Sequence, residues 1–219
     1  LEDLLKMTDS IAEDTNRKSG SVMLAGEIQN EWQMKDYEDL AKVLCVSELL
    51  QTYFKVFSSQ FPVIEDRKDF QSHERPTNYV DSSLKIFAIN IQQAAITSAW
   101  FNDQKDNEYN PVHDHQALLS GVLYLKIPEY LPSRKNKNLD GSIHFLANES
   151  KTDGMMTNSN MILFPKVGDL FLFSSSLKHL VYPFRTADGK GIRRSLSFNI
   201  KDKVAFSTDV YNQWTHEVA

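Results

Sequence analysis

The amino-acid sequence predicts a mainly β domain of the sandwich or jelly-roll type, with helices at its N-terminal end. Three observations predict it. Apolar residues recur at helical spacing in about the first 60 residues, the chain from about Leu84 breaks into short β-rich runs, and clusters of turn residues separate those runs. Short strands joined by turns are typical of sandwiches and jelly rolls.

Two helices are predicted in the N-terminal part of the chain. A short helix covers Leu1–Glu13. A longer helix covers Asp36–Phe57, with Asp36 as a candidate N-cap. We expect its apolar stripe to pack against the rest of the protein and assign it no function. The stripe consists of Leu40, Val43, Leu44, Leu50, Phe54 and Phe57.

Short strands are predicted from Leu84 onward, and turn residues at 102–107, 136–141 and 188–191 separate several of them. The polar stretch 132–138 is predicted to be a long loop, and loops on a rigid scaffold often carry substrate selectivity. The predicted strands are Lys85–Ile91, Ala94–Phe101, Ser120–Lys126, Gly141–Leu146, Met161–Phe164, Asp169–Ser174, Val181–Phe184 and Arg193–Ile200.

Length and composition favour a single domain. The chain has 219 residues, of which 41% are hydrophobic and 24% charged, which is close to the averages for globular proteins. Since one domain usually takes about 100–200 residues, we expect one domain over 1–219. Within it we expect a mainly helical support region at 1–83, a jelly-roll core at 84–200 and a C-terminal extension at 201–219.

Charge and hydropathy argue against nucleic acid and membrane as partners. The formal net charge is −5, and no Lys/Arg block interleaved with aromatic residues offers a surface for a phosphate backbone. The longest apolar runs, such as Ile162–Pro165, are far shorter than the roughly 20 residues that span a bilayer. The single cysteine, Cys45, falls in an apolar helical pattern where a free thiol is usually buried. We expect a cytoplasmic protein.

Two histidines stand two residues apart, just before a predicted strand. Side chains at positions i and i+2 of an extended segment point to the same side, so the imidazoles of His113 and His115 can reach one point. Imidazole binds iron, zinc, copper and nickel, so the pair alone does not identify a metal. The alternative interpretation is two solvated loop histidines.

A third histidine, His179, follows a Pro/Gly turn and an apolar strand that bring the chain back. The strand after it, Arg193–Asn199, carries Arg193 and Ser195 on one face and Arg194 on the other. A buried guanidinium is costly unless an anion pairs with it, and an arginine with a hydroxyl two residues later can clamp a carboxylate. The alternatives are an edge-strand histidine and a surface ladder of Arg and Ser.

The order of these motifs resembles the Fe(II)/2-oxoglutarate-dependent oxygenase superfamily, and most closely its bacterial and phage members whose first ligand motif is H-x-H. The resemblance covers roughly Ala99–Ile200. Four motifs carry it: H-x-H at His113, S-G-V-x-Y-L at Ser120, P-x-x-G-D-L-x-x-F at Pro165 with His179 after it, and R-x-S-x-x-F-N at Arg193.

The resemblance implies a double-stranded β-helix (jelly roll) and an iron site at His113, His115 and His179. The superfamily usually has H-x-D or H-x-E, which completes a triad of two histidines and one carboxylate. Here His115 stands in the place of that acid. Two ligand sets stay open: three imidazoles, which we expect, or Asp114 turned inward by a bulge as the alternative ligand.

The resemblance also implies a co-substrate and a reaction. Arg193 with Ser195 would bind the distal carboxylate of 2-oxoglutarate, and Tyr124 would add a hydrogen bond. With Fe(II) and O2, and with ascorbate as an accessory reductant, such a dioxygenase couples decarboxylation of 2-oxoglutarate to hydroxylation of a protein side chain, an amino acid or a small metabolite. No catalytic residue beyond the metal ligands is implied. The sequence predicts neither the primary substrate nor the oligomeric state.

Two other functions fit parts of the pattern. A cupin-like metalloenzyme that does not use 2-oxoglutarate would need the three histidines but would leave the R-x-S motif without a role. A non-catalytic jelly-roll binding module would have kept the scaffold and lost the iron, and the missing acid of H-x-D supports it. Metal content together with 2-oxoglutarate-dependent succinate formation separates the three functions.

Overall fold

The computed structural model describes residues 1–17, 28–60, 94–131, 139–146 and 160–202. The chain divides into two compact units. One comprises Leu1–Tyr37 with Ile96–Ile200, and the other comprises Glu38–Ala95 with Lys201–Ala219. A single domain over the whole chain stays a prediction. The candidate site lies in the first unit, which contains nearly all of the described strands.

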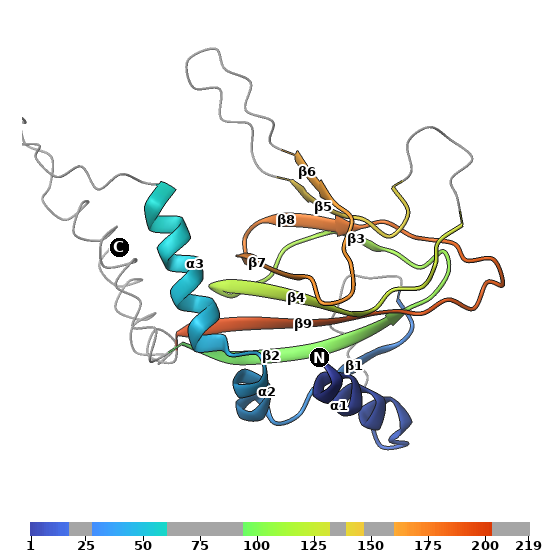
Figure 1. Cartoon of the computed structure of the whole chain (residues 1–219), viewed down its shortest axis with the longest axis horizontal. Coiled ribbons are helices and arrows are strands. Elements are labelled where there is room, and N and C mark those ends of the chain that lie inside the picture. Colours follow the sequence, from blue (N-terminus) through green and yellow to red (C-terminus); the bar gives the residue numbers. More distant parts are fainter. Residues whose placement is uncertain (18–27, 61–93, 132–138, 147–159, 203–219) are drawn as a thin grey trace, which may run out of the picture. The chain divides into compact units, whose positions relative to one another are not determined.

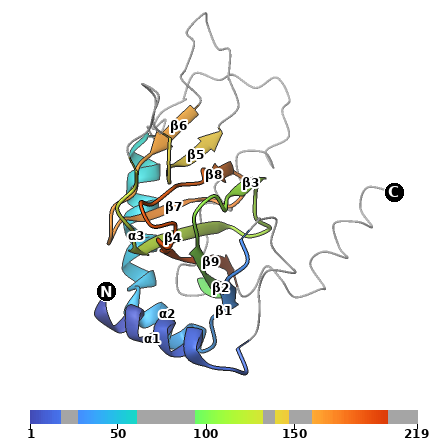
Figure 2. The same ribbon diagram turned by 90° about the vertical axis from the view of Figure 1, so that its right-hand side faces the viewer.

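The strands of the described residues form two antiparallel sheets in two layers, which Figure 1 and Figure 2 show from two sides. The five-stranded sheet has the order β1-β2-β9-β4-β7 and the four-stranded sheet the order β3-β8-β5-β6. This confirms the predicted class, a mainly β jelly roll with helices. The strands are β1 (Glu31–Gln33), β2 (Ala94–Gln104), β3 (Asn110–His113), β4 (Leu119–Lys126), β5 (Ile143–Leu146), β6 (Asn160–Leu163), β7 (Leu170–Ser174), β8 (Lys178–Val181) and β9 (Arg193–Asp202).

Apolar side chains from both sheets meet in one core between the layers. The rings of Phe145 on β5 and Phe173 on β7, for example, lie 4.8 Å apart between their centroids. Each fully buried side chain of this kind contributes about 1.5–3 kcal/mol of burial free energy, so the core holds the two layers together. Its buried members are Val122, Tyr124, Ile143, Phe145, Phe173 and Val181.

The alternation of side chains along β9 sends its two arginines to opposite faces of the five-stranded sheet. Arg193 faces the other sheet. Arg194 faces α1 (Glu2–Glu13), which lies on the outer side of the five-stranded sheet in Figure 1. There its Nε and one terminal nitrogen each donate to the Asp103 carboxylate at 2.6 Å, and it also donates to Thr8 and Asp9 of the helix. This buried ion pair ties α1 to the sheet.

The helix predicted at the start of the chain is confirmed as α1. The helix predicted over Asp36–Phe57 is two helices, α2 (Tyr37–Val43) and α3 (Val46–Gln60). Cys45 separates them with a φ of 48°, a left-handed conformation that an α-helix cannot contain. Cys45 is exposed, so the prediction of a buried thiol is wrong. None of the helices described is long and apolar enough to cross a membrane.

Most predicted strands are present, and three differences have physical causes. The strand predicted at Val181–Phe184 is wrong, because β8 ends at Val181 and Pro183 has no N–H to continue the ladder. The sequence analysis missed β1, which is only three residues long, and β3, which contains Pro111. The predicted strand Lys85–Ile91 and the predicted loop 132–138 lie outside the described residues.

Removing the Asp103 carboxylate should destabilise the fold, because it leaves the Arg194 guanidinium, only 5% exposed, with a single partly exposed acid as its ionic partner. Breaking a buried pair from one side costs about 3–5 kcal/mol. We expect Asp103→Ala to lower the free energy of unfolding by about 3 kcal/mol, measured by urea denaturation. The control is Asp9→Asn. Because the Asp9 carboxylate is half exposed, this change should lower the free energy of unfolding by less than about 1 kcal/mol. Equal losses in the two variants would contradict this account.

Candidate functional site

The pairing of β3 with β8 brings two of the predicted metal ligands face to face. His113 is the last residue of β3, and His179 is the second residue of β8. The two are Cα partners in the antiparallel register, and their ring centroids lie 4.2 Å apart. Two short strands far apart in the sequence therefore supply one pair of imidazoles.

His115 joins this pair from the loop that follows β3. Its backbone N–H donates to the carbonyl of Ser175 at 2.8 Å, which holds the loop beside the end of β7. Its ring centroid lies 5.1 Å from that of His113 and 5.2 Å from that of His179. One ligand atom of each imidazole lies within 4.8 Å of the others. The structure thus brings together the three histidines that the sequence singled out.

Two of the imidazoles have a defined tautomer that suits a metal. The Nδ1 atom of His113 lies 2.7 Å from the carbonyl oxygen of Pro111, and Nδ1 of His179 lies 2.9 Å from that of Leu177. Because a carbonyl only accepts, Nδ1 carries the proton and donates it. The lone pair then lies on Nε2 of both rings, and this backbone support is typical of metal-bound histidines.

The site keeps its imidazoles neutral. Burial, with the neighbouring histidines, lowers the pKa of His115 to about 4. Burial and the proximity of His113 lower the pKa of His179 to about 4, and burial lowers the pKa of His113 as well. Since a metal binds the neutral imidazole, three neutral donors directed at one point form a suitable set for Fe(II) or another divalent ion.

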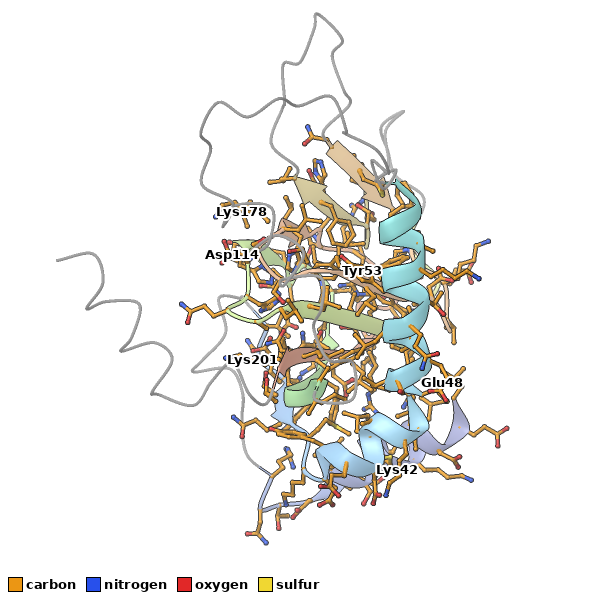
Figure 3. All side chains as sticks on the ribbon, turned by 90° about the vertical axis from the view of Figure 1, so that its left-hand side faces the viewer. Lys42, Glu48, Tyr53, Asp114, Lys178 and Lys201 are labelled. Atoms are coloured by element: carbon orange, nitrogen blue, oxygen red, sulfur yellow. The ribbon has the colours of Figure 1, made fainter. Side chains whose placement is uncertain are left out.

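Asp114, the alternative ligand, lies outside this cluster. Its carboxylate accepts a hydrogen bond from Nζ of Lys178 at 3.0 Å, and both side chains are exposed. Figure 3 shows the two residues beside each other. The Lys178 ammonium lowers the pKa of Asp114. Alternation along an extended segment directs Asp114 away from its two histidine neighbours, and the carboxylate pairs with Lys178 at the surface instead.

Arg193 lies in the pocket that also contains the three imidazoles. The residue is 2% exposed. One terminal nitrogen donates to the carbonyl of Gly141 at 2.6 Å and the other to Oε1 of Gln104, while Nε is buried without a hydrogen-bond partner. Both partners are neutral. Among the residues that the structure describes, the guanidinium is therefore a buried positive charge with no carboxylate bonded to it, in contrast to Arg194 next to it.

Ser195 and Tyr124, the other predicted co-substrate residues, also line this pocket. They are Cα partners in the pairing of β9 with β4. The Arg193 guanidinium carbon lies 5.5 Å from the centroid of the Tyr124 ring. Burial raises the pKa of Tyr124 to about 12, so its hydroxyl keeps its proton at neutral pH and can donate it. Arg193, Ser195 and Tyr124 thus bring hydrogen-bond donors to the lining of one pocket.

Several residues in and beside the pocket were not singled out from the sequence. The sequence predicts Gln104 in a turn and Gly141 where a turn meets a strand, and in the structure both hold the Arg193 guanidinium in place. Gly141 has a φ of 69°, and a Cβ atom there would meet the ring of Tyr130, so glycine is required for this contact. Asn102 and Asn110 line the pocket as well. No sequence signal singles out Asn102 and Gln104, because Asp103 between them is polar too and the end of β2 shows no alternation.

Acid should destabilise the metal-free protein through its imidazoles. An ordinary histidine titrates near pH 6.5, so between about pH 6.5 and pH 4 the unfolded chain binds more protons at His115 and His179 than the folded one. Their contribution to the free energy of unfolding is lost as the pH falls through this window. Glu31, whose pKa burial raises to about 7, acts with the opposite sign. We therefore expect the free energy of unfolding of His179→Gln, measured by urea denaturation at several pH values, to fall less in acid than that of the wild type. The same pH dependence in both proteins would contradict the lowered pKa of His179.

Comparison with known proteins adds a family to this geometry. No curated protein matches the chain. Among solved structures, an oxidoreductase of the 2OG-Fe(II) oxygenase family from Burkholderia pseudomallei is similar at a TM-score of 0.35 and 14% identity, covering 53% of this chain and 52% of that one. A Pseudomonas putida prolyl-4-hydroxylase is similar at a TM-score of 0.46 and 11% identity, and the match covers 90% of this chain and 84% of that one. A cupin-2 domain protein from Shewanella frigidimarina is similar at a TM-score of 0.24 and 10% identity, and the match covers 48% of this chain and 70% of that one.

These structures all have TM-scores below 0.5, so they support no conclusion about activity. The family match rests on the sequence instead. A family model described as "Putative 2OG-Fe(II) oxygenase" matches residues 98–199. This stretch contains the three histidines and the Arg193 strand, and it coincides with the range over which the motifs resemble the superfamily. Over residues 98–199, just under half of its length, this chain therefore matches the 2OG-Fe(II) oxygenase family, as the order of its motifs predicts.

Proposed function

We propose that the protein is an Fe(II)- and 2-oxoglutarate-dependent dioxygenase that hydroxylates a primary substrate. One observation carries the proposal: a convergent set of three neutral imidazoles shares a pocket with a buried arginine that has no anionic hydrogen-bond partner in the described part of the chain. A metal-binding end and an anion-binding end in one pocket suit a co-substrate that is a keto acid at one end and a carboxylate at the other. Small-molecule co-substrates and a cytoplasmic location belong to the same proposal.

The residues of the pocket fit the metal. His113, His115 and His179 would hold Fe(II) through imidazole nitrogens, and the carbonyls of Pro111 and Leu177 keep Nε2 of two of them available. When bound, the iron with 2-oxoglutarate and O2 supplies the oxidising power for hydroxylation, with succinate and CO2 as the other products. The protein's own contribution is to orient these groups and exclude water from them.

The residues also fit the distal carboxylate of 2-oxoglutarate. Removing a guanidinium from water without an anion is costly, and Arg193 is 2% exposed and its hydrogen-bond partners among the described residues are neutral. A carboxylate would complete it with charge-assisted hydrogen bonds. The hydroxyls of Ser195 and Tyr124 can donate to the same carboxylate, since burial keeps Tyr124 protonated. A cupin-like enzyme would use the imidazoles but would leave this charge without a partner.

The ligand set can be tested by comparing two neighbouring substitutions. We expect His115→Ala to weaken Fe(II) binding at least about tenfold, because it removes one of the three convergent donors. Asp114→Ala should leave Fe(II) affinity within about threefold of the wild type, because its carboxylate pairs with Lys178 on the surface. Both are measured by anaerobic calorimetric titration. The opposite result, in which Asp114→Ala loses Fe(II) binding and His115→Ala keeps it, would overturn the three-imidazole site. The ligands would then be two histidines and one carboxylate.

The co-substrate role can be tested on two adjacent arginines. Arg193→Met should weaken 2-oxoglutarate binding by about 2–5 kcal/mol, because it removes a buried charge partner, and should leave Fe(II) affinity nearly unchanged. Arg194→Lys is the control, since it keeps a cation beside Asp103 on the other face of β9. Titration of 2-oxoglutarate into each iron-loaded protein gives both affinities. An unchanged affinity in Arg193→Met together with a loss in Arg194→Lys would show that the assignment of the two faces is wrong.

A further inference from the structure

In and beside the pocket, three side chains carry buried oxygen atoms that have no hydrogen-bond partner among the described residues, and we call this group the acceptor wall. Asn102 and Asn110 both line the pocket, and Oδ1 of each is buried and unpartnered. Both carboxylate oxygens of Glu31 are also buried and unpartnered. An unsatisfied buried polar atom costs about 1–3 kcal/mol. Three such side chains from three strands are not explained by iron or 2-oxoglutarate, and a ligand that completes their hydrogen bonds would explain them.

The strand pairing places Glu31 on the same side of the sheet as Asn102. The two residues are Cα partners of β1 and β2, and side chains of directly opposed residues project from the same face with Cβ atoms about 4.5–5.5 Å apart. Trp100 and Gln104 project from this face too, since they stand two residues to either side of Asn102. Glu31 is 1% exposed and Asn102 is 5% exposed, so bulk water does not reach these oxygens.

The chemistry of this wall requires a donor. The unpartnered atoms are carboxylate and amide carbonyl oxygens, which accept hydrogen bonds. Burial and the nearby Glu108 carboxylate raise the pKa of Glu31 to about 7, so this carboxyl is partly protonated near neutral pH, and a bound cation would favour its ionised form. Glu108 itself is held by the backbone N–H of Lys105 at 2.9 Å. A ligand that brings both N–H donors and a positive charge would satisfy the oxygens and offset the buried carboxylate.

The pocket also offers an apolar path from this wall to the imidazoles. Ile28 and Trp100 line the pocket together with the asparagines, and the Trp100 ring lies 5.6 Å from the His115 ring. An aliphatic stem could lie along the indole, whose face also attracts a cation. Arg193 lines the same pocket, and its guanidinium donates to Gln104, two residues along β2 from Asn102. The pocket therefore offers groups for an anion as well as groups for a cation.

We propose that Glu31, Asn102 and Asn110 bind a cationic nitrogen group, an ammonium or guanidinium on an aliphatic stem, and that this group belongs to the primary substrate. The term substrate rests on the proposed function, whereas the cation site itself does not. The substrate class is thus an alkylamine or alkylguanidine, either as a free molecule or as the side chain of lysine or arginine. In each case the stem would pass Trp100 on its way to the metal.

Binding of simple probes to the full-length chain tests the site without turnover. n-Pentylamine and agmatine are titrated against 1-pentanol, a neutral probe similar to pentylamine in size, with binding followed by calorimetry in the presence and absence of anaerobic Fe(II) and 2-oxoglutarate. We expect both cations to bind at least about tenfold more tightly than the alcohol. Glu31→Gln should remove this preference, and Glu129→Gln, an exposed acid outside this pocket, should retain it. Free lysine and a short peptide with lysine at its centre distinguish the two sources of the group.

The variants keep the test decisive. Glu31→Gln has nearly the same shape and removes the ionisable carboxyl, so it should fold, and Asn102→Leu provides a second, uncharged change on the same wall. A preference for cations that both variants weaken supports the proposal. Equal binding of amine and alcohol, or a preference that survives in Glu31→Gln, overturns it. If the cations bind but Fe(II) and 2-oxoglutarate do not, the cation site is supported and the oxygenase function is refuted. If Fe(II) and 2-oxoglutarate bind but the cations show no preference over the alcohol, only the cation site is refuted.

Discussion

The candidate site depends on the alternation of side chains along β9. Two adjacent arginines stand on this strand, and the pleat sends them to opposite faces. Arg194 meets Asp103 and Asp9 and becomes part of the structure. Arg193 donates hydrogen bonds to Gln104 and to a carbonyl oxygen, both neutral, so its charge remains available inside the pocket. A slip of one residue in the β4–β9 register would exchange these roles.

The sequence could predict the parts of the fold that repeat a local pattern. The first helix and the strands around Ser120–Lys126 and Arg193–Ile200 follow from periodicity and turn residues, and they were found nearly at their observed bounds. The break at Cys45 could not be predicted, because a left-handed φ at a cysteine has no local sequence signal. The three-residue strand β1 exists only through its pairing with β2, and no pattern of that length is informative.

The site shows the same division between local and distant information. The spacing of His113 and His115 predicts that they share a side, and the R-x-S motif predicts which arginine faces inward. The contact of His113 with His179 depends on the β3–β8 register, which only the motif order indicated. Gln104, Asn102 and Glu31 could not be selected from the sequence, because their roles arise only once the sheets have formed. Gln104 then accepts a hydrogen bond from Arg193, and the side-chain oxygens of Asn102 and Glu31 are buried without a partner among the described residues.

The central claim is that three imidazoles and Arg193 together bind Fe(II) and 2-oxoglutarate in one pocket. The most direct test is an anaerobic titration of the metal-free protein with Fe(II) and then with 2-oxoglutarate, followed by visible absorption. This account predicts that a weak charge-transfer band appears only after the second addition and saturates at one equivalent of each. Tight metal binding without such a band would contradict the co-substrate role and favour a metalloenzyme of the cupin type, and absence of metal binding would contradict the site as a whole.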